Sequence, residues 1–273
     1  MRTLNNHLIL YDAECPMCNV YTKAFVQTGL LGKEGRAPYQ SLHENSCPLV
    51  DRQRAVNEIA LVNQETGEVT YGVKSLFKIL ANALPALRYL FNLEPFIGLM
   101  SRMYAFISYN RRVIIPAKAT EAFQYQPTFR LKYRIAYLFL NWVMTSFILT
   151  AYAHLLIGVV PIGSVYREYL ICGGQIFFQG LIVSLIAKEK KWDYLGNMMT
   201  ISFAGSLLLG FVLLEAHWIG HQPIFYTAYF MLVAGLMFLE HIRRTKLLQL
   251  GWTLTITWAL YRAAILLLIL LIN

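Results

Sequence analysis

Five long apolar stretches constrain the fold of this chain more than any other feature. They cover about residues 135–157, 168–187, 195–214, 223–240 and 250–272, and each approaches the ~20 residues that a helix needs to cross a bilayer. Only 14% of the 273 residues are charged, whereas globular domains have about a quarter. We therefore expect an all-α transmembrane bundle of about five spans over residues 126–273, after a separate domain over residues 1–125.

Basic residues in the connections predict how the chain crosses the membrane. They gather before the first stretch, between the second and third, and between the fourth and fifth: Arg130, Lys132, Arg134; Lys188, Lys190, Lys191; Arg243, Arg244, Lys246. Because Lys and Arg concentrate in cytoplasmic loops, we expect a multi-pass membrane protein (of the inner or plasma membrane, if bacterial). Its N-terminal domain would be cytoplasmic and its C-terminus outside. The formal charge of +9 then reflects membrane orientation, and no nucleic-acid partner is expected.

A Cys-x-x-Cys pair stands where a predicted strand passes into a predicted helix. The apolar run Leu8–Tyr11 predicts a short buried strand, and a helical pattern follows Cys15-Pro16-Met17-Cys18. Proline suits the first position of a helix, and the helix N-terminus favours the thiolate of Cys15. Cys18, one turn further, is placed to attack a mixed disulfide formed on Cys15. This arrangement is typical of thioredoxin-like redox sites.

The same stretch resembles the DCC family of predicted thiol-disulfide oxidoreductases, named for an Asp and two Cys. The matching residues are Asp12, Cys15 and Cys18, and Ala13 stands where the family usually has Gly. Two further segments resemble the family: Ile59–Asn63 with Gly67 and Tyr71–Gly72, and Tyr109–Arg111. The resemblance covers about the first two fifths of the chain. It implies a thioredoxin-like fold and dithiol chemistry.

The pattern of the N-terminal half predicts an α/β thioredoxin-like domain. After the first strand we expect a helix over 16–30, a strand over 37–42, a short helix near 51–55, a hairpin of strands 58–63 and 68–71, and an amphipathic helix over 73–84. Thioredoxin-like proteins usually carry a proline just before the third strand, where this chain has Arg54–Asn57. Residues 85–122 are expected to be helical, with breaks at Pro95 and Pro116.

Two questions about the cysteine pair stay open from the sequence. Cys15 and Cys18 could instead join His43 and Cys47 in a structural zinc site, since three cysteines and one histidine form a common zinc set. Asp12 could accept a proton from Cys18 during exchange or could cap the turn or helix through backbone N–H groups. As an anion, Asp12 would oppose formation of the Cys15 thiolate. Glu14 is expected to be a solvated loop residue.

Several polar residues in the apolar stretches are further candidates. Arg262 lies midway along the fifth stretch at a depth similar to Asn141, Gln175 and Gln179, so it is either a clamp between helices or a functional group. Near the outer end of the third stretch, Glu215, His217 and His221 could bind a metal ion or surround a quinone head group.

Together these features favour a membrane-anchored thiol-disulfide oxidoreductase of the protein-disulfide reductase type. Its catalytic residues would be Cys15, Cys18 and Asp12, with no cofactor beyond the redox-active dithiol. The expected partners are a protein or small-molecule disulfide, a cytosolic thiol reductant and membrane lipid. The alternatives are a zinc-stabilised binding domain on a membrane anchor, and a transporter or membrane scaffold with a thiol-sensing N-terminal domain.

Overall fold

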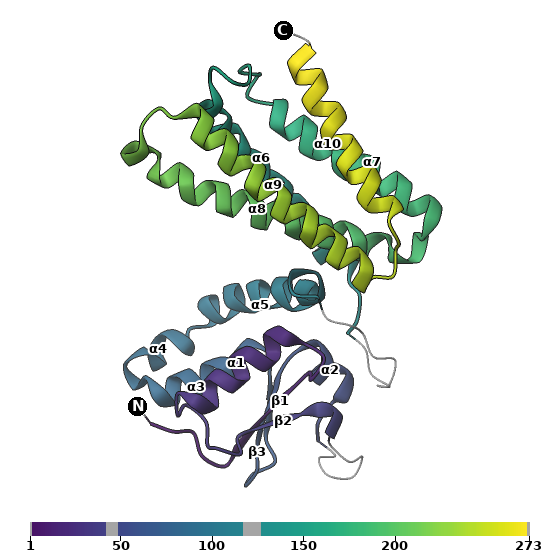
Figure 1. Ribbon diagram of the computed structural model, residues 1–273. Helices are drawn as coiled ribbons and strands as arrows, with labels where there is room; N and C mark the ends of the chain where they lie inside the picture. Colours follow the sequence, from purple (N-terminus) through teal and green to yellow (C-terminus); the bar gives the residue numbers. More distant parts are fainter. Residues whose placement is uncertain (1, 42–48, 117–126, 272–273) are drawn as a thin grey trace. The chain divides into compact units, whose positions relative to one another are not determined.

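The computed structural model describes residues 2–41, 49–116 and 127–271 (Figure 1). These form two compact units, Met1–Tyr133 and Arg134–Asn273. The sequence places the boundary near residue 125. The later boundary arises because the first turn of α6 (Leu131–Ala153) belongs to the N-terminal unit, where the ring of Tyr133 stacks on Tyr109 with 4.8 Å between centroids.

The N-terminal unit is built on a small mixed sheet. Its strands are β1 (His7–Tyr11), β2 (Arg36–Pro38), β3 (Ala60–Asn63) and β4 (Val69–Tyr71), in the order β2-β1-β3-β4. β1 pairs parallel with β2 and antiparallel with β3, and β3 pairs antiparallel with β4. The predicted hairpin is confirmed, and Gly67 supplies the positive φ of 74° that its turn requires.

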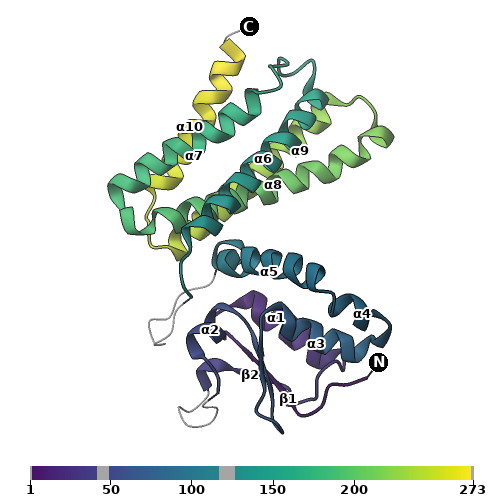
Figure 2. The ribbon, with the colours of Figure 1, turned by 180° about the vertical axis from the view of Figure 1, so that it is seen from behind.

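Alternating side chains of the central strands face two separate cores, as the period of a strand dictates. Leu10 on β1 joins Ala60 and Val62 on β3 in one core, which includes residues of α2 (Arg52–Asn57). Ile9 and Leu61 point to the opposite face. That face is covered by α1 (Pro16–Gln27), α3 (Val73–Ala83) and α5 (Glu94–Ile114), as Figure 2 shows from behind.

Several predicted bounds shift for local reasons. α1 ends at Gln27, three residues early, because Gly29 turns the chain with a φ of 73°. β2 stops at Pro38 and continues as a 3₁₀ turn, Tyr39–Ser41. The helical region is interrupted at residues 92–93, just before Pro95, which occupies the first turn of α5, where proline is tolerated, and α5 ends at Ile114, before Pro116. Between α3 and α5 the chain forms the short helices η2 (Pro85–Leu87) and α4 (Arg88–Phe91).

The C-terminal unit is a helical bundle. It contains α6, α7 (Arg167–Ile186), α8 (Lys191–Ile219), α9 (Pro223–Leu247) and α10 (Thr253–Leu271), with short 3₁₀ turns at His154–Leu156 and Lys188–Lys190. In the described part of the chain, five helices are long and apolar enough to cross a membrane. The five-span count predicted from the sequence is therefore confirmed at the level of length and composition.

The bundle carries apolar side chains outside and polar ones inside. Leu185, Trp218 and Ile224 are among the most exposed, each at 80% or more, which suits a surface facing lipid. Gln179 and His241 are buried, at 0% and 1% exposed. α8 and α9 extend beyond the predicted apolar stretches. The last turns of α9 carry charged side chains. These turns remain helical because Arg243 and Arg244 form ion pairs with Glu240 on the same helix.

Candidate functional site

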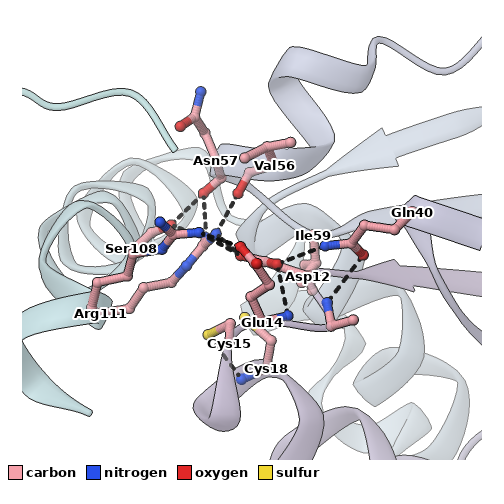
Figure 3. A network of polar contacts seen from close by, with 12 residues as sticks. Asp12, Glu14, Cys15, Cys18, Gln40, Val56, Asn57, Ile59, Ser108 and Arg111 are labelled. Atoms are coloured by element: carbon pink, nitrogen blue, oxygen red, sulfur yellow. Dashed lines mark hydrogen bonds and ion pairs between the residues drawn. The ribbon is translucent and has the colours of Figure 1, made fainter. Parts of the chain in front are cut away.

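The cysteine pair lies at the junction of β1 and α1, as the sequence predicts. The Cys15 N–H donates to the carbonyl of Asp12 (3.1 Å) in the turn after β1. Cys15 is the N-cap residue of α1, and Pro16 occupies the first turn. The Cys15 sulfur accepts the backbone N–H of Cys18 (3.3 Å; Figure 3). The thiol of Cys15 therefore takes the place of an ordinary capping oxygen at a helix N-terminus.

This position separates the two thiols electrostatically. The pKa of Cys15 is lowered to about 7, because the Cys18 side chain hydrogen-bonds to it and because Arg111 and the Cys18 backbone N–H favour the thiolate, whereas burial and Asp12 oppose it. The pKa of Cys18 is raised far above its ordinary value by its bond to Cys15 and by burial. Cys15 is thus the more acidic thiol of the pair, and Cys18 the less acidic one.

The carboxylate of Asp12 is held by three N–H donors. One oxygen accepts from the Gln40 amide (2.9 Å) and the Glu14 backbone (3.1 Å), and the other accepts from Arg111 (2.8 Å). Asp12 therefore caps the turn that precedes α1, while the helix itself is capped by Cys15. Of the two predicted roles, the capping role has a direct hydrogen bond in the structure.

Arg111 is the residue that sequence reasoning did not assign to the site. It reaches Asp12 from the last turn of α5, and its guanidinium also donates to the carbonyls of Val56 (2.5 Å) and Asn57 (3.2 Å) at the end of α2 (Figure 3). The segment Arg54–Asn57, where a thioredoxin-like proline was expected, thus presents two carbonyls to this arginine. In the sequence, Arg111 stands out only as part of the Tyr109–Arg111 segment that resembles the family. A buried acid needs a cation nearby, so the burial of Asp12 is the signal that points to Arg111 as its partner.

Glu14 differs from its expectation as a solvated residue. Its side chain is buried, and one of its oxygens lies 3.1 Å from Arg112, which also lies 3.9 Å from Asp12. Both carboxylates beside the cysteine pair are therefore matched by arginines at the end of α5. Asp12 opposes thiolate formation at Cys15, as the sequence predicts, but its carboxylate is paired with Arg111 and the pKa of Cys15 is lowered overall.

Both thiols are almost fully buried, with Cys15 2% and Cys18 4% exposed. A pocket of about 240 Å³ lined by α1, α3 and α5 reaches Cys18, whereas Cys15 is not part of its lining. Cys18 and Arg111 are the groups in its lining that belong to the site, and the rest is largely apolar: Met17, Tyr21, Phe25, Leu76, Tyr104, Ile107 and Ser108. The pocket has room for one side chain or a small organic molecule.

The zinc alternative requires four residues, of which the structure describes Cys15 and Cys18. His43 and Cys47 lie outside the described residues. Over the ranges that are described, no three His, Cys, Asp or Glu side chains are grouped to hold a metal ion. Glu215, His217 and His221, the candidates near the C-terminal end of α8, are exposed, and α8 ends at Ile219, before the second histidine.

The intramembrane candidates are brought together only in part. Gln179 accepts a hydrogen bond from Tyr194 (2.8 Å) and donates to Thr257 (3.2 Å). Arg262 lies over the ring of Trp258, 4.2 Å from its centroid. It forms no ion pair with any acidic residue in the described chain, and its Nε is without a partner. Of the three side chains expected at the depth of Arg262, Gln179 is thus paired with Tyr194 and Thr257, whereas the side-chain nitrogens of Asn141 and Gln175 have no hydrogen-bond partner among the described residues.

Comparison of the chain with protein-family models, with curated proteins and with solved structures gave no match. The functional argument therefore depends on the geometry of the site itself.

Proposed function

We propose that the protein is a membrane-anchored thiol-disulfide oxidoreductase whose N-terminal unit is a thioredoxin-like domain of the DCC type. The observation that carries the proposal is the capping thiol: Cys15 ends the turn after β1 and accepts the N–H of Cys18 at the start of α1. The strand order β2-β1-β3-β4, with β3 antiparallel to β1, supports the fold assignment. The buried Arg111–Asp12 pair supports the family resemblance, since it joins two of the matching motifs.

The proposed reaction is the reduction of a substrate disulfide. The Cys15 thiolate attacks one sulfur of the substrate, so that a Cys15–substrate disulfide forms and the other substrate sulfur leaves as a thiolate. Cys18 then passes its proton to the released substrate thiolate and attacks the Cys15 sulfur. The Cys15–Cys18 disulfide forms and the second substrate thiolate is released. The substrate gains two electrons, and a cytosolic dithiol or two thiols restore the reduced pair.

The burial of the thiols supports a narrow substrate. Since Cys15 and Cys18 are 2% and 4% exposed, a disulfide inside a folded surface has no direct path to them. A small-molecule disulfide, or a disulfide on an extended peptide segment, fits the described pocket better.

The charge pattern of the connections supports a cytoplasmic N-terminal unit. A reporter fused after Asn273 tests this orientation, and a cytoplasmic signal from it would contradict the proposal.

The test of the chemistry is to trap the mixed disulfide. The full chain is purified with Cys47→Ser and Cys172→Ser, so that only the pair remains, and Cys18→Ser is added. Glutathione disulfide is the probe in solution, and mass spectrometry reads the adduct. We expect a stable adduct on Cys15 in the Cys18→Ser protein and none after a further Cys15→Ser change. A protein that forms no adduct would contradict the redox proposal, as would an unmodified chain, with Cys47 present, that carries one zinc ion and no titratable thiols.

A further inference from the structure

A group of buried polar side chains without partners lies in the middle of the helical bundle. In the described residues, no hydrogen bond is made by Asn141 Nδ2 and Thr145 Oγ1 on α6, Gln175 Nε2 on α7, or Trp258 Nε1 and Arg262 Nε on α10. Four of these residues are at most 6% exposed, and Arg262 is half-buried with its Nε enclosed. We call these five residues the polar cluster. Each unpaired buried polar group is costly in an apolar surrounding.

Contacts between α6 and α7 place two members of the cluster at one depth. The Trp142 indole donates to the carbonyl of Tyr169 (2.9 Å), and a Cβ at Gly173 would lie 3.3 Å from the same indole nitrogen. α6 at residue 142 therefore lies against α7 at residues 169–173. Asn141 precedes this contact by one residue on α6, and Gln175 follows it by two residues on α7.

Contacts between α7 and α10 place the other members at the same depth. The Tyr261 hydroxyl donates to the carbonyl of Ile171 (2.9 Å), and a Cβ at Gly174 would lie 2.5 Å from that hydroxyl. α10 at residue 261 therefore lies against α7 at residues 171–174, within a turn of the contact with α6. Arg262 follows Tyr261, and Trp258 lies one turn before Arg262.

The neighbouring polar groups of the bundle show that unpaired side chains are not general here. Gln179, one turn below Gln175 on α7, is paired with Tyr194 and Thr257. His241 bonds to Tyr194 (3.2 Å) and to Thr255 (3.1 Å). In the described bundle, Ser146 Oγ, next to Thr145 on α6, is also unpaired, so the unpaired groups gather in and beside the polar cluster. A bound group that completes their hydrogen bonds explains the lack of partners.

The chemistry of the unpaired atoms indicates what that group is. Four of the five are N–H donors, and one belongs to a guanidinium. Glu168, in the first turn of α7, pairs with Arg167 (2.8 Å), and Arg262 has no carboxylate partner among the described residues. Its position over Trp258 offsets part of the cost of burying the charge. An anion with oxygen acceptors would neutralise the charge of Arg262 and accept hydrogen bonds from the unpaired N–H groups.

We propose that the polar cluster is a binding site for a carboxylate within the membrane bundle. Arg262 pairs with the carboxylate, and Gln175 and Asn141 donate to its oxygens. The ligand could come from the bilayer, as an acid with an acyl chain, or from water, as a small soluble acid. Both kinds of ligand carry the carboxylate group that the site would bind.

Binding can be measured on the full chain in a non-ionic detergent. Octanoate, octanol and acetate are titrated separately at constant pH and ionic strength, and the apparent melting temperature and tryptophan fluorescence are followed. Octanol matches octanoate without the charge, and acetate has the charge without the acyl chain. Arg262→Gln and Gln175→Leu are the test variants. Arg243→Gln is the matched control, because it removes an arginine from an exposed position of the same bundle.

We expect octanoate to raise the melting temperature in proportion to the logarithm of its concentration, and octanol to have no such effect. Arg262→Gln should weaken octanoate binding about tenfold or more, without lowering the melting temperature of the free protein, and Arg243→Gln should leave binding unchanged. A response to acetate as strong as that to octanoate assigns the site to a soluble acid, and a response to octanoate alone assigns it to a lipid-borne acid. Equal effects of octanoate and octanol, or full octanoate binding by both test variants, would overturn the proposal.

The Cys15→Ser, Cys18→Ser double variant should bind octanoate as the unmodified chain does. The carboxylate site and the redox proposal can therefore fail independently of each other.

Discussion

The buried ion pair between Arg111 and Asp12 allows a sharp prediction about the cysteine site. The guanidinium lies 2.8 Å from the carboxylate, and the two side chains are 6% and 1% exposed. The same guanidinium donates to the carbonyls of Val56 and Asn57. Replacing Arg111 with Gln would leave a buried carboxylate without its closest cation and the Val56 carbonyl without its donor, while the Asn57 carbonyl would keep its bond from Ser108. It would also remove a positive charge that favours the thiolate of Cys15.

Both effects have an expected size. Removing one partner of a buried ion pair costs about 3–5 kcal/mol, which corresponds to a fall in melting temperature of roughly 10 °C for a chain of this size. The pKa of Cys15 should rise from about 7 toward its ordinary value. A rise of about one unit would lower the thiolate fraction at pH 7 roughly fivefold.

The assay is the rate of Cys15 alkylation by iodoacetamide as a function of pH. It uses the full chain with Cys47→Ser and Cys172→Ser, so that the pair is unchanged. The matched control is Arg102→Gln, because this arginine lies on the same helix, α5, and is exposed. Substitutions at exposed positions usually change stability by about 0.5 kcal/mol or less, so we expect the control to keep its melting temperature within a few degrees.

A second variant separates the effect on the pKa of Cys15 from a loss of folding. Arg111→Gln combined with Asp12→Asn removes both charges, so the penalty for an unpaired buried carboxylate disappears and part of the stability should return. The pKa of Cys15 should nevertheless stay raised, because Arg111 acts on it more strongly than Asp12 does. A folded Arg111→Gln protein whose alkylation midpoint stays near pH 7 would refute this reasoning.

Three further predictions follow from local features. In the unmodified pair, alkylation of Cys15 should increase as pH rises through about 7, because its lowered pKa sets the thiolate fraction, whereas Cys18 should stay unreactive up to pH 9 by mass spectrometry. Gly72→Ala should lower the melting temperature by several degrees, since residue 72 has a φ of 62° and a Cβ there would lie 2.9 Å from a Glu58 oxygen; an unchanged melting temperature would contradict the strain. Asp51→Ala removes the N-cap of α2 and should cost about 1 kcal/mol, measured as a small loss of thermal stability.

The parts of the fold that follow from short-range patterns could be predicted from the sequence. The continuous apolar run Leu8–Tyr11 predicts a buried strand. In the structure Leu10 and Ile9 lie in the two opposite cores of the sheet. The cysteine pair is equally local, because its place at the strand–helix junction depends only on the residues around it. The five membrane helices follow from the length of their apolar runs.

The parts that depend on distant residues could not be predicted. Arg111 lies 99 positions from Asp12 in the sequence, and no periodicity links the end of α5 to the turn after β1. Glu14 was expected in solvent because its own partner, Arg112, lies 98 positions away. The length of α9 was underestimated for another reason. Its last turns are charged, yet they remain helical because Glu240 pairs with Arg243 and Arg244 on the same helix.

The contacts of Asp12 decide how its role in the proposed chemistry should be understood. Alone, a carboxylate beside Cys15 would disfavour the thiolate. A buried arginine, however, needs an anion, and Asp12 holds Arg111 at the site where its charge lowers the pKa of Cys15. To accept a proton from Cys18, Asp12 would have to give up bonds to Arg111, Gln40 or the Glu14 N–H. We therefore infer that Asp12 is a positioning residue, which acts on Cys15 through Arg111.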